Sequence, residues 1–381
     1  SLLTPSDIME YATFTCLPDL CLLVIFKHLN RTDIYHMATV SKRMNKIANE
    51  RCLEKIKWEN GLLYVAQTSC GYGFSLVVRS HDYPFGYLTD YRYDIAVDGH
   101  HLDEGNAPKT LVQIAYLYNA FAADKGDEDK LRDRMFPDVS SPHNAPIPDA
   151  LFHQLKLLLR YHQARVIVLK QIPFEWRIFN ELNSILGDHH ATHLRCHGMT
   201  ISQVSDETRK SFTQFIKNIR MVDLTQSNQL ECNLINDSFL LDVTNGKLRR
   251  FFDRNGPNST CTQSFYPSEV LLPRIARLHS MFTTAMTLKV EWLANFLMMV
   301  LESASSDFEH LHNWMFRINQ PMTFDVIADQ IRKPDFKCYR EMISTPGGLQ
   351  EKQVLAHIKH DIKAELYLST NVDRHFVVMF F

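Results

Sequence analysis

Two kinds of segment alternate along the C-terminal part of this chain, and their regular spacing limits the folds that it can adopt. Short apolar runs typical of buried strands recur at residues 166–169, 193–197, 221–224, 248–252, 275–279 and 308–312. Segments with apolar residues at helical spacing lie between them, as at 175–186, 205–217 and 291–302. We take as equivalent positions in the six runs the residues Leu169, Cys196, Leu224, Phe252, Leu278 and Leu311. The number of residues between these positions is nearly constant over the first five runs and larger before the last.

The nearly constant step predicts an irregular α/β solenoid in this part of the chain. A step of about this size falls in the range of leucine-rich repeats, in which each unit is a strand followed by a helix. The consensus of those repeats is poorly matched, so the predicted arrangement is leucine-rich-repeat-like and no closer. A doubly wound α/β sheet also alternates strands with helices and is the alternative.

The region before residue 150 has a different character. Apolar and aromatic runs separated by glycines and prolines predict a short β-rich segment at residues 58–135, which links to or caps the solenoid. Within it, residues 111–121 have helical periodicity and are predicted to form a helix. Several prolines between residues 137 and 148 mark a boundary, so the C-terminal α/β domain is predicted to span residues 150–381.

Near the N-terminus, apolar residues at helical spacing predict three short helices. Leu22 and Phe26 lie on one face of the first helix, and Pro18 suits its first turn because a proline there lacks only an N–H that has no partner. Ile34 belongs to a second apolar stripe, and Ser41 can cap a third helix. Three short helices form a small core at best. An apolar face left over would therefore bind a partner.

The spacing of these residues resembles the F-box, a helical module that binds the Skp-type adaptor of cullin–RING ubiquitin ligases. Leu17-Pro18 opens the motif, Ile25-Phe26 begins seven residues after the proline, and Asp33-Ile34 falls on the next helix. The resemblance places an F-box domain at residues 14–57. It implies that the adaptor is bound by Leu17, Pro18, Leu22, Ile25, Phe26, Leu29, Asp33, Ile34 and Val40.

The sequence departs from the usual F-box pattern at three positions. Leu20, Ser41 and Met44 stand where members of the family often have Glu, Cys and Trp. These departures concern the detail of the adaptor contact. The alternative is an ordinary three-helix cap on a larger domain, which explains the apolar stripe but not the whole spacing.

The C-terminal region resembles the type-2 F-box-associated domain, found in the F-box families expanded in nematodes. Residues 286–297 and 303–311 form one matching block, and residues 357–368 and 375–381 form another. The resemblance implies that residues 150–381 are a substrate-binding domain ending in a pair of strands. Asp361-Ile362 stands where relatives often have Asp-Gly at the turn.

Charge and composition narrow the functional classes. The 381 residues carry a net charge of −2, which gives no electrostatic reason to expect nucleic acid or an anionic membrane as a partner. No run approaches the roughly twenty apolar residues of a transmembrane helix. The eight cysteines are dispersed, which predicts reduced thiols in the cytoplasm or nucleus.

No pattern of residues predicts catalysis or a cofactor. The densest group of candidate ligands consists of His189, His190, His193, Cys196 and His197. Structural zinc sites pair two such clusters, and no second one exists in the sequence, so these residues are predicted to belong to a strand and its surroundings. A phosphate loop, a nucleophile elbow and a metalloprotease motif are all missing from the sequence. We therefore predict no enzyme, no metal and no cofactor.

Together these features predict a substrate-recognition subunit of a Skp–cullin–F-box ubiquitin ligase. The N-terminal helices would bind the adaptor and, through it, a cullin; the C-terminal domain would capture an unidentified target protein. Outward-facing charges on successive strands predict target contacts at Arg195, Asp223 and Arg249, with the choice between Arg249 and Arg250 left open by the register. The alternatives are an adaptor-bound scaffold without ligase activity and a small-molecule enzyme on a doubly wound sheet.

Overall fold

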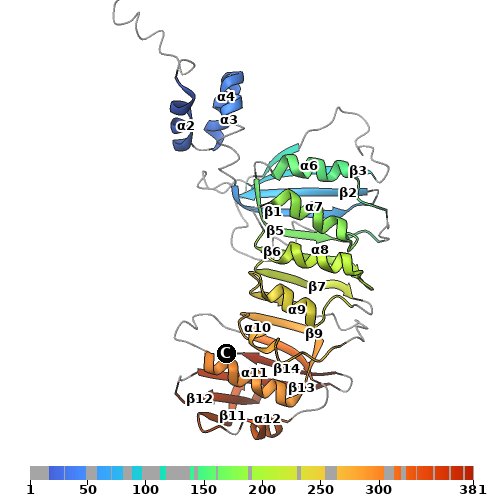
Figure 1. Ribbon diagram of the computed structural model, residues 1–381, viewed down its shortest axis with the longest axis vertical. Helices are drawn as coiled ribbons and strands as arrows, with labels where there is room; N and C mark the ends of the chain where they lie inside the picture. Colours follow the sequence, from blue (N-terminus) through green and yellow to red (C-terminus); the bar gives the residue numbers. More distant parts are fainter. Residues whose placement is uncertain are drawn as a thin grey trace, which may run out of the picture.

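The computed structural model describes most of the chain. The described residues are 17–29, 31–48, 58–69, 71–79, 88–96, 112–116, 138–140, 145–159, 162–187, 191–229, 233–253, 264–303, 313–318, 323–331, 333–345, 348–359, 362–371 and 374–380. They form three N-terminal helices with a hydrophobic cluster of their own and a larger mixed α/β body (Figure 1).

Among the described residues, fourteen strands form one sheet in the order β11-β12-β13-β14-β10-β9-β8-β7-β6-β5-β1-β2-β3-β4. The centre of the sheet is parallel and consists of β1 (Trp58–Gln67), β5 (His162–Lys170), β6 (His193–Ile201), β7 (Met221–Gln229), β8 (Arg250–Phe252), β9 (Ser280–Leu288) and β10 (Asn313–Ile318). One end is the antiparallel set β2 (Gly71–Arg79), β3 (Leu88–Ala96) and β4 (Val112–Tyr116). The other end is β14 (Arg374–Phe380), β13 (Ile362–Asn371), β12 (Gly348–His357) and β11 (Phe336–Thr345).

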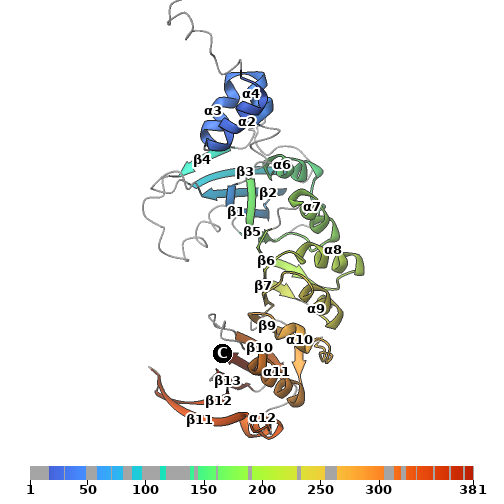
Figure 2. The same cartoon turned by 60° about the vertical axis from the view of Figure 1, so that its left-hand side comes forward.

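The helices of the body follow one another along the sheet. They are α6 (Asp149–Leu159), α7 (Trp176–Leu186), α8 (Asp206–Ile216), α9 (Asp237–Thr244), α10 (Leu272–Ile275), α11 (Val290–Ser303) and α12 (Phe324–Gln330). Figure 2 shows α6, α7, α8, α9 and α11 on the same side of the strands. A doubly wound sheet has helices on both faces, so this arrangement differs from the doubly wound alternative.

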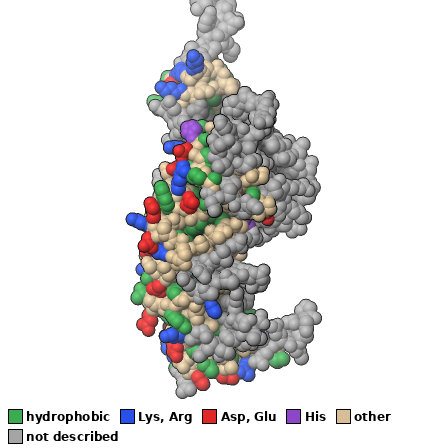
Figure 3. Space-filling view, turned by 90° about the vertical axis from the view of Figure 1, so that its right-hand side faces the viewer, with side chains coloured by type: hydrophobic (Ala, Val, Ile, Leu, Met, Phe, Trp, Pro, Cys, Tyr) green, Lys and Arg blue, Asp and Glu red, His purple; other side chains and the backbone are tan. Residues whose placement is uncertain are grey.

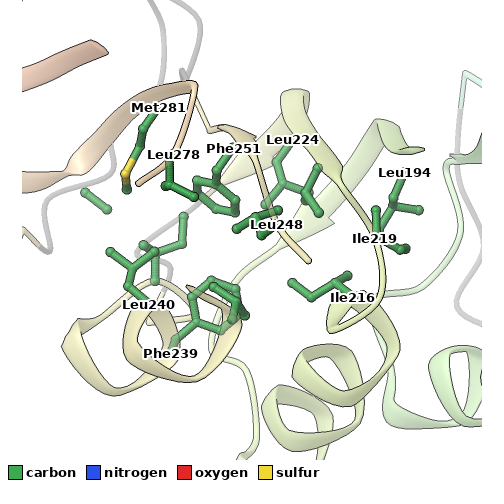
Figure 4. Packing of buried hydrophobic residues seen from close by; sticks show 14 of the residues in the cluster. Leu194, Ile216, Ile219, Leu224, Phe239, Leu240, Leu248, Phe251, Leu278 and Met281 are labelled. Carbon is green, nitrogen blue, oxygen red and sulfur yellow. The ribbon is translucent and has the colours of Figure 1, made fainter. Parts of the chain in front are cut away.

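One row of buried side chains crosses the sheet on the face that the helices cover. Nine of the strands contribute one residue each, and the pairing register aligns Leu63, Ile167, Leu194, Val222, Phe251, Met281, Trp314, Met379 and Leu366. All of them are at most 1% exposed. Figure 4 shows Leu194, Phe251 and Met281 of this row with Phe239 and Leu240 of α9. Since the side chains of neighbouring residues in a strand point to opposite faces of the sheet, the face away from the helices carries a different set of side chains.

Phenylalanine rings connect the helices to this row. The ring of Phe179 on α7 lies 4.8 Å from that of Phe212 on α8, which lies 6.0 Å from that of Phe239 on α9. Phe239 in turn lies 6.1 Å from Phe251 on β8. These separations are in the range of favourable aromatic contacts, so consecutive helices are packed against each other as well as against the sheet.

The predicted strand at 275–279 is wrong. Those residues include the end of α10 and the turn after it, and the strand β9 begins only at Ser280. Ile275 and Leu278 are buried, but at a helical spacing, and Pro273 lies in the first turn of α10. The predicted strand at 308–312 lies outside the described residues; β10 begins at Asn313. In the observed register the step between aligned residues lengthens at every strand from β5 to β10.

The helix predicted at 111–121 is also wrong, because residues 112–116 form β4. The apolar residues of that segment fit both an alternating and a helical pattern. The segment predicted at 58–135 joins the same sheet, since β1 pairs with β5, and its buried residues share one cluster with α6. The boundary predicted near residue 150 therefore corresponds to no break in the sheet.

A buried carboxyl group lies at the end of β8. Asp253 is completely buried, and its carboxylate accepts hydrogen bonds from the hydroxyl of Thr283 and the backbone N–H of Thr284, both at 3.0 Å. Burial raises the pKa of Asp253 from 3.8 to about 7, and the two hydrogen bonds oppose that shift. Between these pKa values the folded chain binds more protons than the unfolded chain, so its stability falls as the pH rises from about 4 to about 7.

Replacing Asp253 with Asn should remove this pH dependence. The amide keeps an acceptor for Thr284 and cannot ionise, so we expect the variant to be more stable than the native chain at pH 8 by roughly 2–4 kcal/mol. The difference should shrink as the pH is lowered toward 5. Chemical denaturation at several pH values measures this effect. Asp242→Asn, at an exposed position on α9, is the control, and an equal pH trend in both variants would contradict the assignment.

Candidate functional site

The three N-terminal helices enclose a small apolar core. They are α2 (Asp19–His28), α3 (Arg31–Val40) and α4 (Lys42–Ile47). Their buried residues are Leu22, Phe26, Ile34, Ala38, Met44, Ile47 and Ala48. The hydroxyl of Ser41 accepts a hydrogen bond from the N–H of Met44 at 3.1 Å, which confirms the predicted cap of the third helix.

Arg43 ties the start of α2 to α4. Its Nε donates to Asp19 Oδ1 at 2.8 Å, and its Nη2 donates to the carbonyl oxygen of Leu17 at 2.5 Å. The pair is largely exposed, so its contribution to stability is small. Its effect is to fix the direction in which Leu17 and Pro18 enter the helix. This role of Arg43 was not predicted from the sequence, which gives no sign of a contact between residues so far apart.

The structure divides the predicted adaptor-binding residues into three groups. Leu22, Phe26 and Ile34 are fully buried in the core of the three helices. Leu17, Ile25 and Leu29 are partly buried against that core. Pro18, Asp33 and Val40 are exposed. The buried group therefore shapes the module, and the partly buried and exposed groups can reach a partner.

Two further apolar side chains on α2 are exposed and were not among the predicted contacts. Leu20 is 74% exposed and Val24 is 56% exposed. They lie four residues apart and so share one face of the helix. Val40, at the end of α3, is 61% exposed. The spacing of Leu20 and Val24 was visible in the sequence, but an apolar stripe alone does not reveal which of its faces is buried.

The predicted target-binding residues are only partly brought together. Arg195 and Asp223 are paired across β6 and β7, on the face away from the helices. Phe252 pairs with Asp223, so Arg250, two residues before it, shares that face. Arg249 precedes the strand and takes no part in its pairing with β7. The register that the sequence left open therefore places Arg250, and not Arg249, beside the other two.

The carboxylate of Asp223 already has partners. It accepts hydrogen bonds from the backbone N–H of Thr225 at 2.9 Å and from the Thr225 hydroxyl at 2.6 Å.

Figure 3 shows one side of the molecule, on which acidic and basic side chains of the body lie next to each other. Neither sign of charge dominates that side.

The residues considered as metal ligands or nucleophiles are arranged as ordinary strand residues. Cys196 is buried, and burial raises the pKa of its thiol, so it is not a reactive thiolate. Burial, and then nearby arginines, lower the pKa of His193. No three His, Cys, Asp or Glu side chains gather as metal ligands within the part of the chain that the structure describes. His189 and His190 lie outside the described residues. Nor does any described helix have the length and apolar character needed to cross a membrane.

Comparison with known protein families identifies the helical module. The family model of the F-box domain matches residues 14–55. F-box domains bind Skp1-type adaptors and, through them, a cullin. The chain therefore contains an F-box domain, as the spacing of its N-terminal residues predicted. A search of curated proteins gives no match.

Two substitutions should separate the shape of the F-box from its contact surface. Phe26→Ala removes a core side chain, a change that costs about 3–5 kcal/mol, which is enough to unfold so small a cluster. We expect it to abolish adaptor binding and to make residues 17–48 sensitive to limited proteolysis. Val40→Asp places a charge on an exposed apolar side chain that is predicted to contact the adaptor, so we expect binding at least about tenfold weaker with unchanged resistance to protease.

Isothermal titration calorimetry with the purified adaptor measures both effects. Lys46→Asp, at an exposed position on α4, is the control and should bind normally. Full adaptor binding by both Phe26→Ala and Val40→Asp would contradict the assignment of this module as the docking site.

Proposed function

We propose that this chain is the substrate-recognition subunit of a Skp–cullin–F-box ubiquitin ligase. The observation that carries the proposal is an F-box domain with its own closed core and with Leu20, Val24 and Val40 left exposed. Exposed apolar side chains on a folded module are typical of protein-binding surfaces. The adaptor would cover them.

The body would hold the target protein. It has a hydrophobic core separate from that of the F-box helices and a sheet face away from its helices that carries Arg195, Asp223 and Arg250. In this role the chain needs no catalytic residue, metal or cofactor. It raises the effective concentration of the target near an enzyme that carries ubiquitin.

The body is proposed to be an irregular α/β solenoid of the type-2 F-box-associated class. Consecutive parallel strands are neighbours in the sheet, and the step between them lies within the range of known repeat proteins; both observations support this. The antiparallel pair β13 and β14 lies where the resemblance implies a terminal pair of strands. Membership of the nematode-expanded families is part of the same proposal.

The chain is proposed to act in the cytoplasm or nucleus. The dispersed cysteines support this, and Cys21, Cys196 and Cys338 are free thiols in the structure.

Capture of a target should depend on the body and its degradation on the F-box. In cells that express Val40→Asp, the chain should keep its targets bound but no longer recruit the cullin, so the targets should accumulate. Quantitative mass spectrometry of proteins purified with the native chain and with Val40→Asp measures both results. Lys46→Asp is the matched control.

The outcomes distinguish the proposal from its alternatives. A set of bound proteins that does not turn over faster when the adaptor-binding chain is present would indicate a scaffold without ligase activity. Loss of the same bound proteins in Val40→Asp would mean that the F-box, and not the body, holds them.

A further inference from the structure

Basic residues recur in the three turns that lead into β7, β8 and β9. The exposed cations of these turns are Lys217, Arg220, Lys247, Arg249, Arg250 and Arg277, and we call this set the basic edge. Residues 216–222, 244–252 and 274–282 contain no aspartate or glutamate. Within the described residues, no ion pair joins any of the six side chains to an acid. A chain whose overall charge is near zero thus has a local excess of positive charge.

Backbone hydrogen bonds hold the turns directly against one another. The N–H of Lys247 donates to the carbonyl oxygen of Lys217 at 2.8 Å, and that of Arg249 donates to the carbonyl oxygen of Arg220 at 2.7 Å. A Cβ at Gly246 would lie 2.1 Å from the carbonyl oxygen of Lys217, so only glycine allows this approach. The cations therefore lie at the starts of neighbouring strands of one sheet, and neighbouring strands are about 4.8 Å apart.

Apolar residues of the same turns fix the orientation of the basic ones. Ile219, Leu248 and Leu278 are at most 2% exposed, and Figure 4 shows them among the packed side chains of the core. Their neighbours Arg220 and Arg249 are exposed. The cations are thus displayed from a rigid frame, which reduces the entropy lost when a ligand binds.

The positive field extends along the sheet to β5 and β6. After burial, the causes that lower the pKa of His193 are the charges of Arg195, Arg165, Arg250 and Arg220. These arginines come from four consecutive strands or the turns before them. Their charges therefore act at one place near the start of β6.

Helix ends explain only part of this charge. Lys217 follows the last residue of α8, and Lys247 lies just beyond α9, where cations favour the negative end of a helix dipole. Arg220, Arg249 and Arg250 lie further on, at the strands. Like charges this close repel each other. The acids nearest in sequence are Asp223, which is hydrogen-bonded to Thr225, Asp253, which is buried and hydrogen-bonded to Thr283 and Thr284, and Asp242 on α9.

We propose that the basic edge binds an extended acidic segment of the target protein, through carboxylate or phosphate groups. The proposal rests on the function proposed above and names the chemistry of the target. Arginine recognises both anions through paired hydrogen bonds. Together with Arg165 on β5 and Arg195 on β6, the basic edge extends over four strand spacings to β9, about 19 Å, which an extended segment of about six residues covers.

Fluorescence anisotropy with the full chain bound to its adaptor tests the proposal. The probes are a labelled peptide of about ten glutamates, a peptide of the same length containing phosphoserines, a glutamine peptide, and a single-stranded oligonucleotide of similar charge. We expect both acidic peptides to bind, the glutamine peptide not to bind, and R220E/R249E/R250E to weaken binding at least about tenfold. The control K156E/K210E/K337E reverses three exposed cations elsewhere on the body and should bind normally.

Each contrary outcome has a separate meaning. If R220E/R249E/R250E and the control K156E/K210E/K337E weaken peptide binding equally, the effect is one of net charge alone, and the proposal is overturned. Tighter binding of the oligonucleotide than of either peptide, lost in R220E/R249E/R250E, would make the edge a nucleic-acid surface. Acidic peptides that fail to bind while the adaptor binds would refute the basic edge and leave the proposed function intact. R220Q/R249Q/R250Q, which introduces no new charge, should also bind more weakly than the control; binding equal to the control would refute the role of these arginines.

Discussion

The body of this protein depends on one row of apolar side chains that runs across its parallel strands beneath the helices. Ile167, Leu194, Val222 and Phe251 are fully buried members of that row, and each such side chain contributes about 1.5–3 kcal/mol through burial. Because each parallel strand from β5 to β10 supplies one residue to the row, the segment that follows each of these strands includes a helix that covers the row. This arrangement sets the length of the repeating unit. It also holds the turns between units in fixed positions, and the basic edge is built from those turns.

The F-box shows how one short motif encodes two properties. Its most recognisable apolar residues, Phe26 among them, are buried in the core of the module, because three short helices need that core for their stability. Contact with a partner is predicted for residues such as Pro18 and Val40, which are exposed. The exposed Leu20 and Val24 add to that surface. A change in a core residue and a change in a surface residue would both stop binding, but for different physical reasons.

Periodicity predicted the central elements of the body well, and it failed where two periods coincided. β5 to β8, α7, α8 and α11 lie where the pattern placed them, since each has a long segment with one clear period. The strand predicted at 275–279 and the helix predicted at 111–121 were wrong, because a short apolar run fits the period of a helix and that of a strand equally well. The choice between Arg249 and Arg250 could not be made from the sequence, because a shift of one residue reverses the faces of a strand and only the pairing with β7 fixes it. Exposure of Leu20 could not be predicted either, since it depends on how the three helices pack.

The central claim is that the chain binds the adaptor with its F-box and leaves the body free to hold a target. Hydrogen–deuterium exchange of the full chain, measured with and without the adaptor, tests it most directly. The account predicts added protection in α2, α3 and α4, with α7, α8 and the strands β6 and β7 unchanged. Added protection across the body, or none in the three N-terminal helices, would contradict it.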